Sequence, residues 1–418
     1  MYRTVRLLAL LLFFAPSLVS CEQEGKEILL PQEEIEESEK PDISDSADNT
    51  ENLEVRDVSG AYISDTISYK EFYKLTNYNF IYPSKDPWGN PIMLSGTISM
   101  ENTLAQEKNA RGIVLYNHYT VYRSDECPSR GKLEVQSMIA GSGLITIAPD
   151  YYGFGITEKE QQAYCIASVN AQAAVDALIY GCRLLQIMGF SWGSPIINVG
   201  YSQGGQTAIA VQRLVDEYYP DIHITRTMAG AGPYDLTETY RRFVQSEVAG
   251  MPSTVISVLL AFNKYYQVGL KREELFVEPT LSHIDDWILS KKYNRTEIDK
   301  LVASLDINSF ATANMVDINS ESTRRMMAAL EKENLCRGWT PNKEDDIFLF
   351  HNVSDITVPY QCTINLYNFL TECGVEHVEL VAKDLGQVYN QPAHESGAIF
   401  FISHVRAYIC QILGINSW

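Results

Sequence analysis

The chain has 418 residues and a formal net charge of −20, from 53 acidic and 33 basic side chains. A chain this acidic, with no basic cluster to neutralise phosphates, does not suit nucleic acid, and we exclude that class of partner. Hydrophobic residues make up 45% of the chain and aromatic residues 11%, so most of it is expected to fold around a core.

The first 20 residues have the pattern of an export signal. Two arginines precede a short apolar run, Leu7–Phe14, and the segment Leu18–Cys21 follows it. Because a membrane span needs about 20 apolar residues, this run is too short to be one. Small residues directly before a cysteine resemble the lipobox of bacterial lipoproteins, which implies that Cys21 is lipidated and begins the mature protein. The alternative is an ordinary cleaved signal followed by a coincidental cysteine.

Residues 21–56 are predicted to be an acidic disordered tether. Between residues 22 and 56 there are 13 acidic and three basic side chains, a net charge of 3 − 13 = −10, and no aromatic residue. Such a stretch cannot bury enough apolar surface to offset the entropy of ordering. Together with a lipidated Cys21, it predicts a protein of the cell envelope, lipid-anchored to a membrane (the outer membrane, with a periplasmic or a surface face).

The strands expected next begin with a hairpin. Tyr78–Tyr82 and Pro91–Ile98 flank the turn-rich segment Asp86–Asn90, which is typical of two antiparallel strands. Gly112–Tyr116 and Leu144–Ala148 follow as continuous apolar runs, of the kind found in strands that are buried on both faces.

The most informative motif is Gly-x-Ser-x-Gly at Gly200–Gly204. The apolar run Pro195–Val199 before it predicts a buried strand, and the spacing of apolar residues after it predicts a helix over Gln206–Tyr219. Strand, sharp turn and helix is the context in which this motif presents its serine, Ser202, as a nucleophile. The turn strains the backbone, and flanking glycines are needed where backbone segments crowd together.

Further elements extend the alternation of strand and helix. A helix over Ala167–Met188 precedes the motif, and strands are expected at Ile224–Met228, Ile347–His351 and His377–Val381. Buried strands that alternate with helices after an initial hairpin predict an α/β fold, with a mostly parallel sheet and helices on both faces.

The interval 236–341 interrupts this alternation. It has no convincing strand and three helical candidates: Thr254–Tyr266, Thr296–Leu305 and Ser322–Asn334. We expect a helical cap inserted between a first core segment, residues 57–235, and a second, residues 342–418. Over the carboxyl edge of the sheet, such a cap forms part of a ligand pocket; the alternative is an appendage that only packs.

A serine nucleophile needs a base, and the base needs a carboxylate to orient it. Asp355 lies four residues beyond the strand Ile347–His351, in the loop at its carboxyl end, whereas Asp345 and Asp346 lie at the opposite end. Asp355 is therefore the predicted acid.

The predicted base is His394. In folds with this strand–turn–helix motif, the three residues follow in the chain order serine, acid, histidine. His394 comes after the acid, follows a polar loop and precedes an apolar helix expected from about Ala398. The other histidines after the serine lie in or beside predicted strands and helices, or lack such surroundings.

Two donors are expected to face a developing oxyanion. One is the backbone N–H of Gln203, directly after the serine, and the other is the N–H of Tyr119, in the loop after the strand Gly112–Tyr116. His118, which shapes that loop, and Tyr201 are candidate substrate-binding residues. The alternative for His118 and Tyr119 is a packed turn with no part in catalysis.

Four segments together resemble the α/β-hydrolase superfamily and, within it, the secretory lipase and esterase group. They are Gly200–Gly205, Ala148–Gly155, Gly230–Leu236, and Asp355 with Val358 and Pro359. The resemblance runs from about Tyr78 to the C-terminus, is weakest in the cap, and implies an α/β-hydrolase fold and serine hydrolysis without fixing a substrate. Relatives usually have His-Gly where this chain has His118-Tyr119, and because glycine lets that backbone turn its N–H inward, the departure bears on the second donor.

The leading hypothesis is a lipid-anchored serine hydrolase that cleaves carboxylic esters, of acylated carbohydrate or of lipid, through an acyl-enzyme. One alternative is a serine peptidase of the same fold, although the cap has no obvious acidic cluster for an N-terminal amine. The other is a surface lipoprotein that only binds glycans or a partner.

Cysteine usage leaves the redox state open. Seven cysteines besides Cys21 are an odd number, so at least one thiol stays free, while one or two disulfides are compatible with an oxidising compartment. No Cys-x-x-Cys or His-Glu-x-x-His spacing occurs, so the sequence predicts no metal site and no cofactor.

Overall fold

The computed structural model describes residues 59–68, 74–131, 134–388 and 391–415. The predicted signal, the predicted lipidation of Cys21 and the predicted tether lie outside these residues, so the structure bears on none of them.

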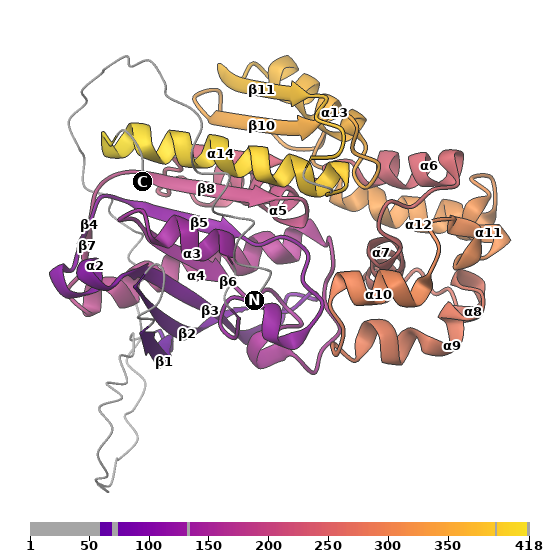
Figure 1. The fold of residues 1–418 in the computed structure, drawn as a ribbon, viewed down its shortest axis with the longest axis horizontal. Helices are drawn as coiled ribbons and strands as arrows, with labels where there is room; N and C mark the ends of the chain where they lie inside the picture. Colours follow the sequence, from indigo (N-terminus) through magenta and orange to yellow (C-terminus); the bar gives the residue numbers. More distant parts are fainter. Residues whose placement is uncertain (1–58, 69–73, 132–133, 389–390, 416–418) are drawn as a thin grey trace, which may run out of the picture.

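A nine-stranded sheet forms the centre of the molecule, in the order β1-β2-β3-β6-β5-β8-β9-β10-β11 (Figure 1). Its strands are β1 (Tyr62–Ser68), β2 (Leu75–Lys85), β3 (Pro91–Glu101), β5 (Ile113–Asn117), β6 (Ile145–Pro149), β8 (Ile196–Tyr201), β9 (Arg226–Gly230), β10 (Asp346–Asn352) and β11 (His377–Lys383). The first three pair antiparallel, and those from β6 to β11 are all parallel. The predicted α/β fold with a mostly parallel sheet is confirmed.

Helices cover both faces of this sheet, as the apolar strands require. Every residue of β5, β6 and β8 is buried. Along β5, Ile113 and Leu115 belong to one apolar cluster, with helices α4 and α5, whereas Val114 and Tyr116 belong to a second cluster, with helix α14. Alternate side chains of one strand thus pack into two layers, which explains its unbroken run of apolar residues.

The helices of the core are α2 (Asn102–Glu107), α3 (Glu134–Ala140), α4 (Ala167–Ile187), α5 (Gln203–Tyr218), α13 (Tyr360–Glu372) and α14 (Ala393–Leu413). Helix α14 is long and apolar enough to cross a membrane by length and composition alone, but in this fold it packs against β8, β9 and β10.

Two helices begin earlier than the sequence predicts. Helix α5 starts at Gln203 instead of Gln206, because the turn at Ser202 leads straight into helical geometry. Helix α14 starts at Ala393 instead of about Ala398, with Pro392 as its N-cap. His394 therefore lies in the first turn of a helix.

The interval between β9 and β10 is helical, as expected, and its strand-like pairings are isolated bridges. It contains α6 (Leu236–Ser246), α7 (Pro252–Tyr265), α8 (Arg272–Leu275), α9 (Thr280–Ile284), α10 (Arg295–Val302), α11 (Ala313–Val316) and α12 (Glu321–Leu330). These helices lie beyond the arrowheads of β10 and β11 in Figure 1, past the carboxyl ends of the parallel strands. We call residues 236–341 the cap; its division from the core stays a prediction.

Three features were not foreseen from the sequence. Strand β1 extends the hairpin by one strand, and β4 (Asn109–Ala110) pairs with β7 (Ser191–Trp192) in a separate two-stranded sheet. The seven cysteines after Cys21 all lie in the described residues, and none of them forms a disulfide there.

Candidate active site

Ser202 occupies a strained turn between β8 and α5. Its backbone has φ 59° and ψ −123°, a conformation that residues other than glycine rarely adopt. Close packing explains the glycines around it, since a Cβ on Gly200 would lie 2.0 Å from the Gly204 carbonyl oxygen. A Cβ on Gly204 would lie 2.1 Å from the carbonyl oxygen of Asn117 and 2.9 Å from that of His118, so the end of β5 and the start of the loop after it pack directly on this turn.

Three side chains from distant parts of the chain meet at this turn. The Nε2 atom of His394 lies 2.8 Å from Oγ of Ser202, and its Nδ1 atom lies 2.5 Å from Oδ2 of Asp355. All three come from the carboxyl edge of the sheet: the turn after β8, the loop after β10 and the first turn of α14. The structure thus brings the predicted nucleophile, base and acid into one hydrogen-bonded line, while their catalytic roles stay predictions.

The Asp355 carboxylate is held on both of its oxygens. Oδ2 contacts His394, and Oδ1 accepts hydrogen bonds from the backbone N–H groups of Thr357 (2.8 Å) and Val358 (3.0 Å). Burial alone raises the pKa of this carboxyl, but the attraction of His394 and His351 and the hydrogen bonds outweigh burial and hold the pKa below its ordinary value. Asp355 is therefore ionised at neutral pH.

His394 responds to its neighbours in the opposite sense. Burial alone lowers the pKa of its imidazole, but the charge of Asp355 and the hydrogen bond to it outweigh burial and raise the pKa above its ordinary value of 6.5. The imidazole is thus made more basic at the place where a proton from Ser202 would go.

A second histidine, His351 at the end of β10, supports the acid loop and was not assigned a role from the sequence. Its ring is fully buried and contacts the Thr363 hydroxyl (2.6 Å) and the Val358 carbonyl oxygen (2.9 Å). Its Nε2 lies 3.7 Å from Oδ2 of Asp355. Burial lowers the pKa of His351. The two ring contacts fix His351 against the acid loop, beside the Asp355 carboxylate.

The two predicted substrate-binding side chains have structural surroundings. The Tyr201 hydroxyl donates a 2.7 Å hydrogen bond to the His394 carbonyl oxygen, so it anchors the backbone of that histidine. His118 is fully buried, with its ring nitrogens facing the carbonyl oxygens of Tyr119 (2.7 Å) and Asp150 (3.3 Å). Neither side chain lines the pocket at Ser202, and their role in substrate binding stays a prediction without support from the fold.

The predicted oxyanion donors lie on either side of the serine turn. Gln203 is the first residue of α5, where backbone N–H groups have no partner within the helix and the helix dipole favours negative charge. Gln203 lines the pocket, and its buried side-chain amide has no hydrogen-bond partner among the described residues. Tyr119 is 36% exposed in the loop after β5, and its donor role stays a prediction.

An apolar pocket opens at Ser202 between the core and the cap. It contains about 520 Å³ of empty space, part of it open to solvent. The cap supplies about half of its walls. The lining residues are Tyr164, Cys165, Ser202, Gln203, Pro233, Leu236, Thr239, Tyr240, Phe243, Thr254, Val255, Val258, Leu330, Thr357 and Val358.

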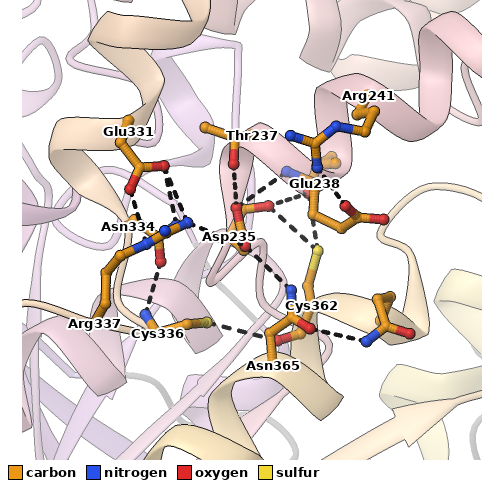
Figure 2. A network of polar contacts seen from close by, with 12 residues as sticks. Asp235, Thr237, Glu238, Arg241, Glu331, Asn334, Cys336, Arg337, Cys362 and Asn365 are labelled. Atoms are coloured by element: carbon orange, nitrogen blue, oxygen red, sulfur yellow. Dashed lines mark hydrogen bonds and ion pairs between the residues drawn. The ribbon is translucent and has the colours of Figure 1, made fainter.

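Figure 2 shows a polar network that ties the first helix of the cap to the core. Asp235 caps α6, since its carboxylate accepts hydrogen bonds from the Thr237 hydroxyl (2.6 Å) and the Glu238 N–H (3.0 Å). Its other oxygen accepts a 3.1 Å hydrogen bond from Asn365 of α13, and Arg337 lies 4.0 Å away. Because α6 lines the pocket, this network fixes one pocket wall relative to the core.

The sheet order, the strained serine turn and the hydrogen-bonded line at the carboxyl edge define an α/β-hydrolase. Residues 133–403 match the family model described as secretory lipase, and the chain belongs to that family. It is accordingly a carboxylic ester hydrolase. In the described residues, no group of three or more histidine, cysteine or acidic side chains is placed to hold a metal ion.

Solved structures of lipases and esterases share this fold. The rice cell wall degrading esterase LipA from Xanthomonas oryzae aligns with a TM-score of 0.69 and 20% identity, over 80% of this chain and 90% of its own. A putative hydrolase from Legionella pneumophila aligns with a TM-score of 0.70 and 22% identity, over 83% and 90%. Lipase A of Candida antarctica in its closed state aligns with a TM-score of 0.63 and 15% identity, over 85% and 83%. No curated protein matches the chain in sequence.

Proposed function

We propose that the protein is a lipid-anchored serine esterase that works through an acyl-enzyme. The observation that carries this proposal is the hydrogen-bonded line from Ser202 through His394 to Asp355, whose first member, Ser202, lines an apolar pocket. Ser202 attacks the ester carbonyl while Nε2 of His394 accepts its proton, and Asp355 holds the opposite ring nitrogen as the N–H donor. His394 then returns the proton to the leaving alcohol, and water releases the acyl group by the same steps.

The oxyanion that forms on the ester carbonyl needs fixed donors. The backbone N–H of Gln203 supplies one, since it stands at the positive end of α5 next to Ser202. The N–H of Tyr119 supplies the second, from the loop that packs on the serine turn. Preorganised donors of this kind contribute about 3 kcal/mol each to lowering the barrier.

Labelling and hydrolysis test the role of the serine. A fluorophosphonate probe should label the wild-type protein and leave Ser202→Ala unlabelled, and hydrolysis of short p-nitrophenyl esters should fall by at least about 10⁴-fold in that variant. Ser403→Ala, which removes an exposed serine of α14, is the matched control. Equal activity of Ser202→Ala and wild type would refute the proposal.

The peptidase alternative has the same nucleophile, so it needs a separate comparison. Family membership favours esters, and a panel of aminoacyl-amides against esters of the same acyl group measures the preference directly. Faster cleavage of the amides than of the esters would favour the peptidase over the esterase.

The pocket supports an acyl group of some length. Its walls include Leu236, Phe243, Val255, Val258 and Leu330, which favour hydrocarbon over a charged group. Acyl esters of two to sixteen carbons therefore form the informative series for the acyl half. The alcohol half is either lipid or carbohydrate, and the fold shared with an esterase named for degrading rice cell wall supports carbohydrate.

The lipid anchor and the envelope location rest on the sequence around Cys21. Metabolic labelling with an alkyne fatty acid, followed by membrane fractionation, should place the wild-type protein in the membrane and release Cys21→Ser to the soluble fraction. Cys373→Ser is the matched control, because its thiol lies at the end of α13 within the folded part. Membrane retention of an unlabelled Cys21→Ser would contradict the anchor and leave the esterase assignment unaffected.

A further inference from the structure

The start of helix α14 faces the cap, and a cap residue pairs with it. In Figure 1 the first turn of α14 is the end that lies toward the cap, since the C-terminus lies at the other end of the helix. Glu395 follows His394 in that first turn, and its Oε1 lies 2.9 Å from Nη2 of Arg295, the first residue of cap helix α10. This ion pair therefore joins the cap to the residue directly after the predicted base.

The same guanidinium is connected to a wall of the apolar pocket. Nη1 of Arg295 lies 2.9 Å from Oδ2 of Asp299, one turn further along α10. Oδ1 of Asp299 accepts a 2.9 Å hydrogen bond from the backbone N–H of Ser253, in the first turn of α7. Because α7 supplies part of the pocket lining, a chain of polar contacts runs from the pocket wall to the residue beside His394.

The charge of Glu395 is balanced by Arg295. No other cation pairs with Glu395 among the described residues, and its Oε2 is buried there without a hydrogen-bond partner. The side chains of Arg295 and Glu395 are 28% and 25% exposed, so water screens their charges less than it screens charges on the open surface. Ion pairs that are partly exposed add little to stability, so stability alone gives this pair no strong role.

The two charges of the pair act on His394 in opposite senses. Burial lowers the pKa of the His394 imidazole, and Asp355 raises it. After these two, Glu395 raises the pKa of His394 further, whereas Arg295 lowers it. Among these groups only Arg295 belongs to the cap, so the cap supplies the charge that offsets Glu395.

Two further titratable side chains lie close to this ring or to its carboxylate partner, and both are uncharged near neutral pH. The Tyr201 ring lies 5.2 Å from the His394 ring, and His351 lies 3.7 Å from Oδ2 of Asp355. Burial raises the pKa of Tyr201 and lowers the pKa of His351. The charges that remain around the imidazole are therefore those of Asp355, Glu395 and Arg295.

We propose that Arg295 is a positioning residue of the cap, which acts on the base His394 through Glu395. With the guanidinium in place, the carboxylate beside the base is neutralised, and the imidazole is free to accept the proton of Ser202 near neutral pH. Without it, the charge of Glu395 holds a proton on the imidazole more tightly. The inference rests on the proposed function, since it concerns the base of that reaction, and it ties the position of the cap to proton transfer at Ser202.

Two variants break the same ion pair but should shift the pH profile in opposite directions. In Arg295→Gln the carboxylate is unpaired, so the acid limb of kcat/KM for a p-nitrophenyl ester should move to higher pH, and in Glu395→Gln it should move to lower pH. Near pH 6, kcat/KM should be about two- to threefold lower than wild type in the first variant and higher by about the same factor in the second. On the plateau at higher pH, both should lie within about twofold of wild type.

Further variants separate charge from structure. Arg295→Lys keeps the charge and should retain the wild-type profile, and the double variant Arg295→Gln with Glu395→Gln should lie between the two single ones. Arg272→Gln is the matched control, because it breaks an ion pair with Asp285 inside the cap, and it should leave the profile unchanged. Thermal melts show whether each variant is folded. Losses of the same sign in Arg295→Gln and Glu395→Gln, or an acid limb in Arg295→Lys displaced as far as in Arg295→Gln, would overturn the inference.

The proton affinity of His394 is also measured without turnover, in the full chain with Ser202→Ala. Histidines labelled with carbon-13 at Cε1 are titrated by NMR, and the His394 signal, one of seven, is identified by its absence in His394→Asn. Its midpoint should be higher after Arg295→Gln and lower after Glu395→Gln. These shifts, in a protein whose wild type hydrolyses no ester, would count against the proposed function and leave the charge balance standing. Normal ester hydrolysis with an unmoved midpoint in both variants would overturn the inference alone.

Discussion

The two ends of strand β10 each hold a buried aspartate, and the two carboxyls have opposite electrostatic surroundings. At the carboxyl end, Asp355 faces His394, His351 and two backbone N–H groups, and its pKa lies below the ordinary value. At the amino end, Asp345 faces another carboxylate, Asp216 of α5. Burial and, after it, the charge of Asp216 together raise the pKa of Asp345 to about 8.

Burial raises the pKa of both carboxyls, so the groups that each one faces decide whether its final pKa lies above or below the ordinary value. Donors and a histidine keep Asp355 charged, as orienting an imidazole requires, whereas a second carboxylate keeps Asp345 protonated. Only the first arrangement lies at the carboxyl edge of the sheet, where loops from several strands converge. The comparison predicts that the same substitution will affect catalysis at one end and stability at the other.

The largest effect is expected at Asp355. Asp355→Asn keeps the shape but loses the charge that raises the pKa of His394 and selects the N–H tautomer at Nδ1, so kcat/KM for a p-nitrophenyl ester should fall about 10³–10⁴-fold. Asp345→Asn is the matched control at the other end of the strand and should have wild-type kcat/KM. Comparable losses in both variants would show that the effect comes from β10 as a whole.

A smaller, graded effect is expected in the pH profile. Ser202 needs a neutral imidazole, and the pKa of His394 is raised above 6.5, so kcat/KM should fall about tenfold per pH unit below an apparent pKa that lies above 6.5. In Asp355→Asn, burial remains but the carboxylate is lost, so the acid limb should move to lower pH. Initial rates in a pH-stat measure both profiles; an acid limb that does not move would separate the pKa of His394 from Asp355.

Much of this site follows from the sequence because its parts obey local rules. The strained turn needs glycines at Gly200 and Gly204, a buried strand before it and a helix after it, and each leaves a pattern that can be read along the chain. The positions of Asp355 and His394 follow from strand ends and chain order. The parallel sheet follows from apolar runs that are buried on both faces.

What could not be predicted depends on where side chains point after folding. Tyr201, a candidate for substrate binding, anchors the His394 backbone, because the side chain before the serine turn faces α14. A second pocket, next to the one at Ser202, is lined by Tyr122, Gln162 and Ser257 from a loop, a second loop and a cap helix, and no spacing in the sequence connects them. Helix α14 starts before His394, with Pro392 as its N-cap, and a hydrophobic pattern does not register where such a helix begins.

The smallest effect is expected at Asp345, and it concerns stability. Its pKa is about 8 in the fold against an ordinary 3.8, so the folded state holds a proton that the unfolded chain releases near pH 4. Stability therefore falls as pH rises from about 4 to about 8 and is lowest above that range. Asp345→Asn mimics the protonated form at every pH, so it should raise the melting temperature by a few degrees near pH 9 and change it little near pH 4. Thermal melts of wild type, Asp345→Asn and Asp355→Asn at both pH values test this prediction. If Asp345→Asn is no more stable than wild type at high pH, the Asp216 carboxylate is not what raises the pKa of Asp345.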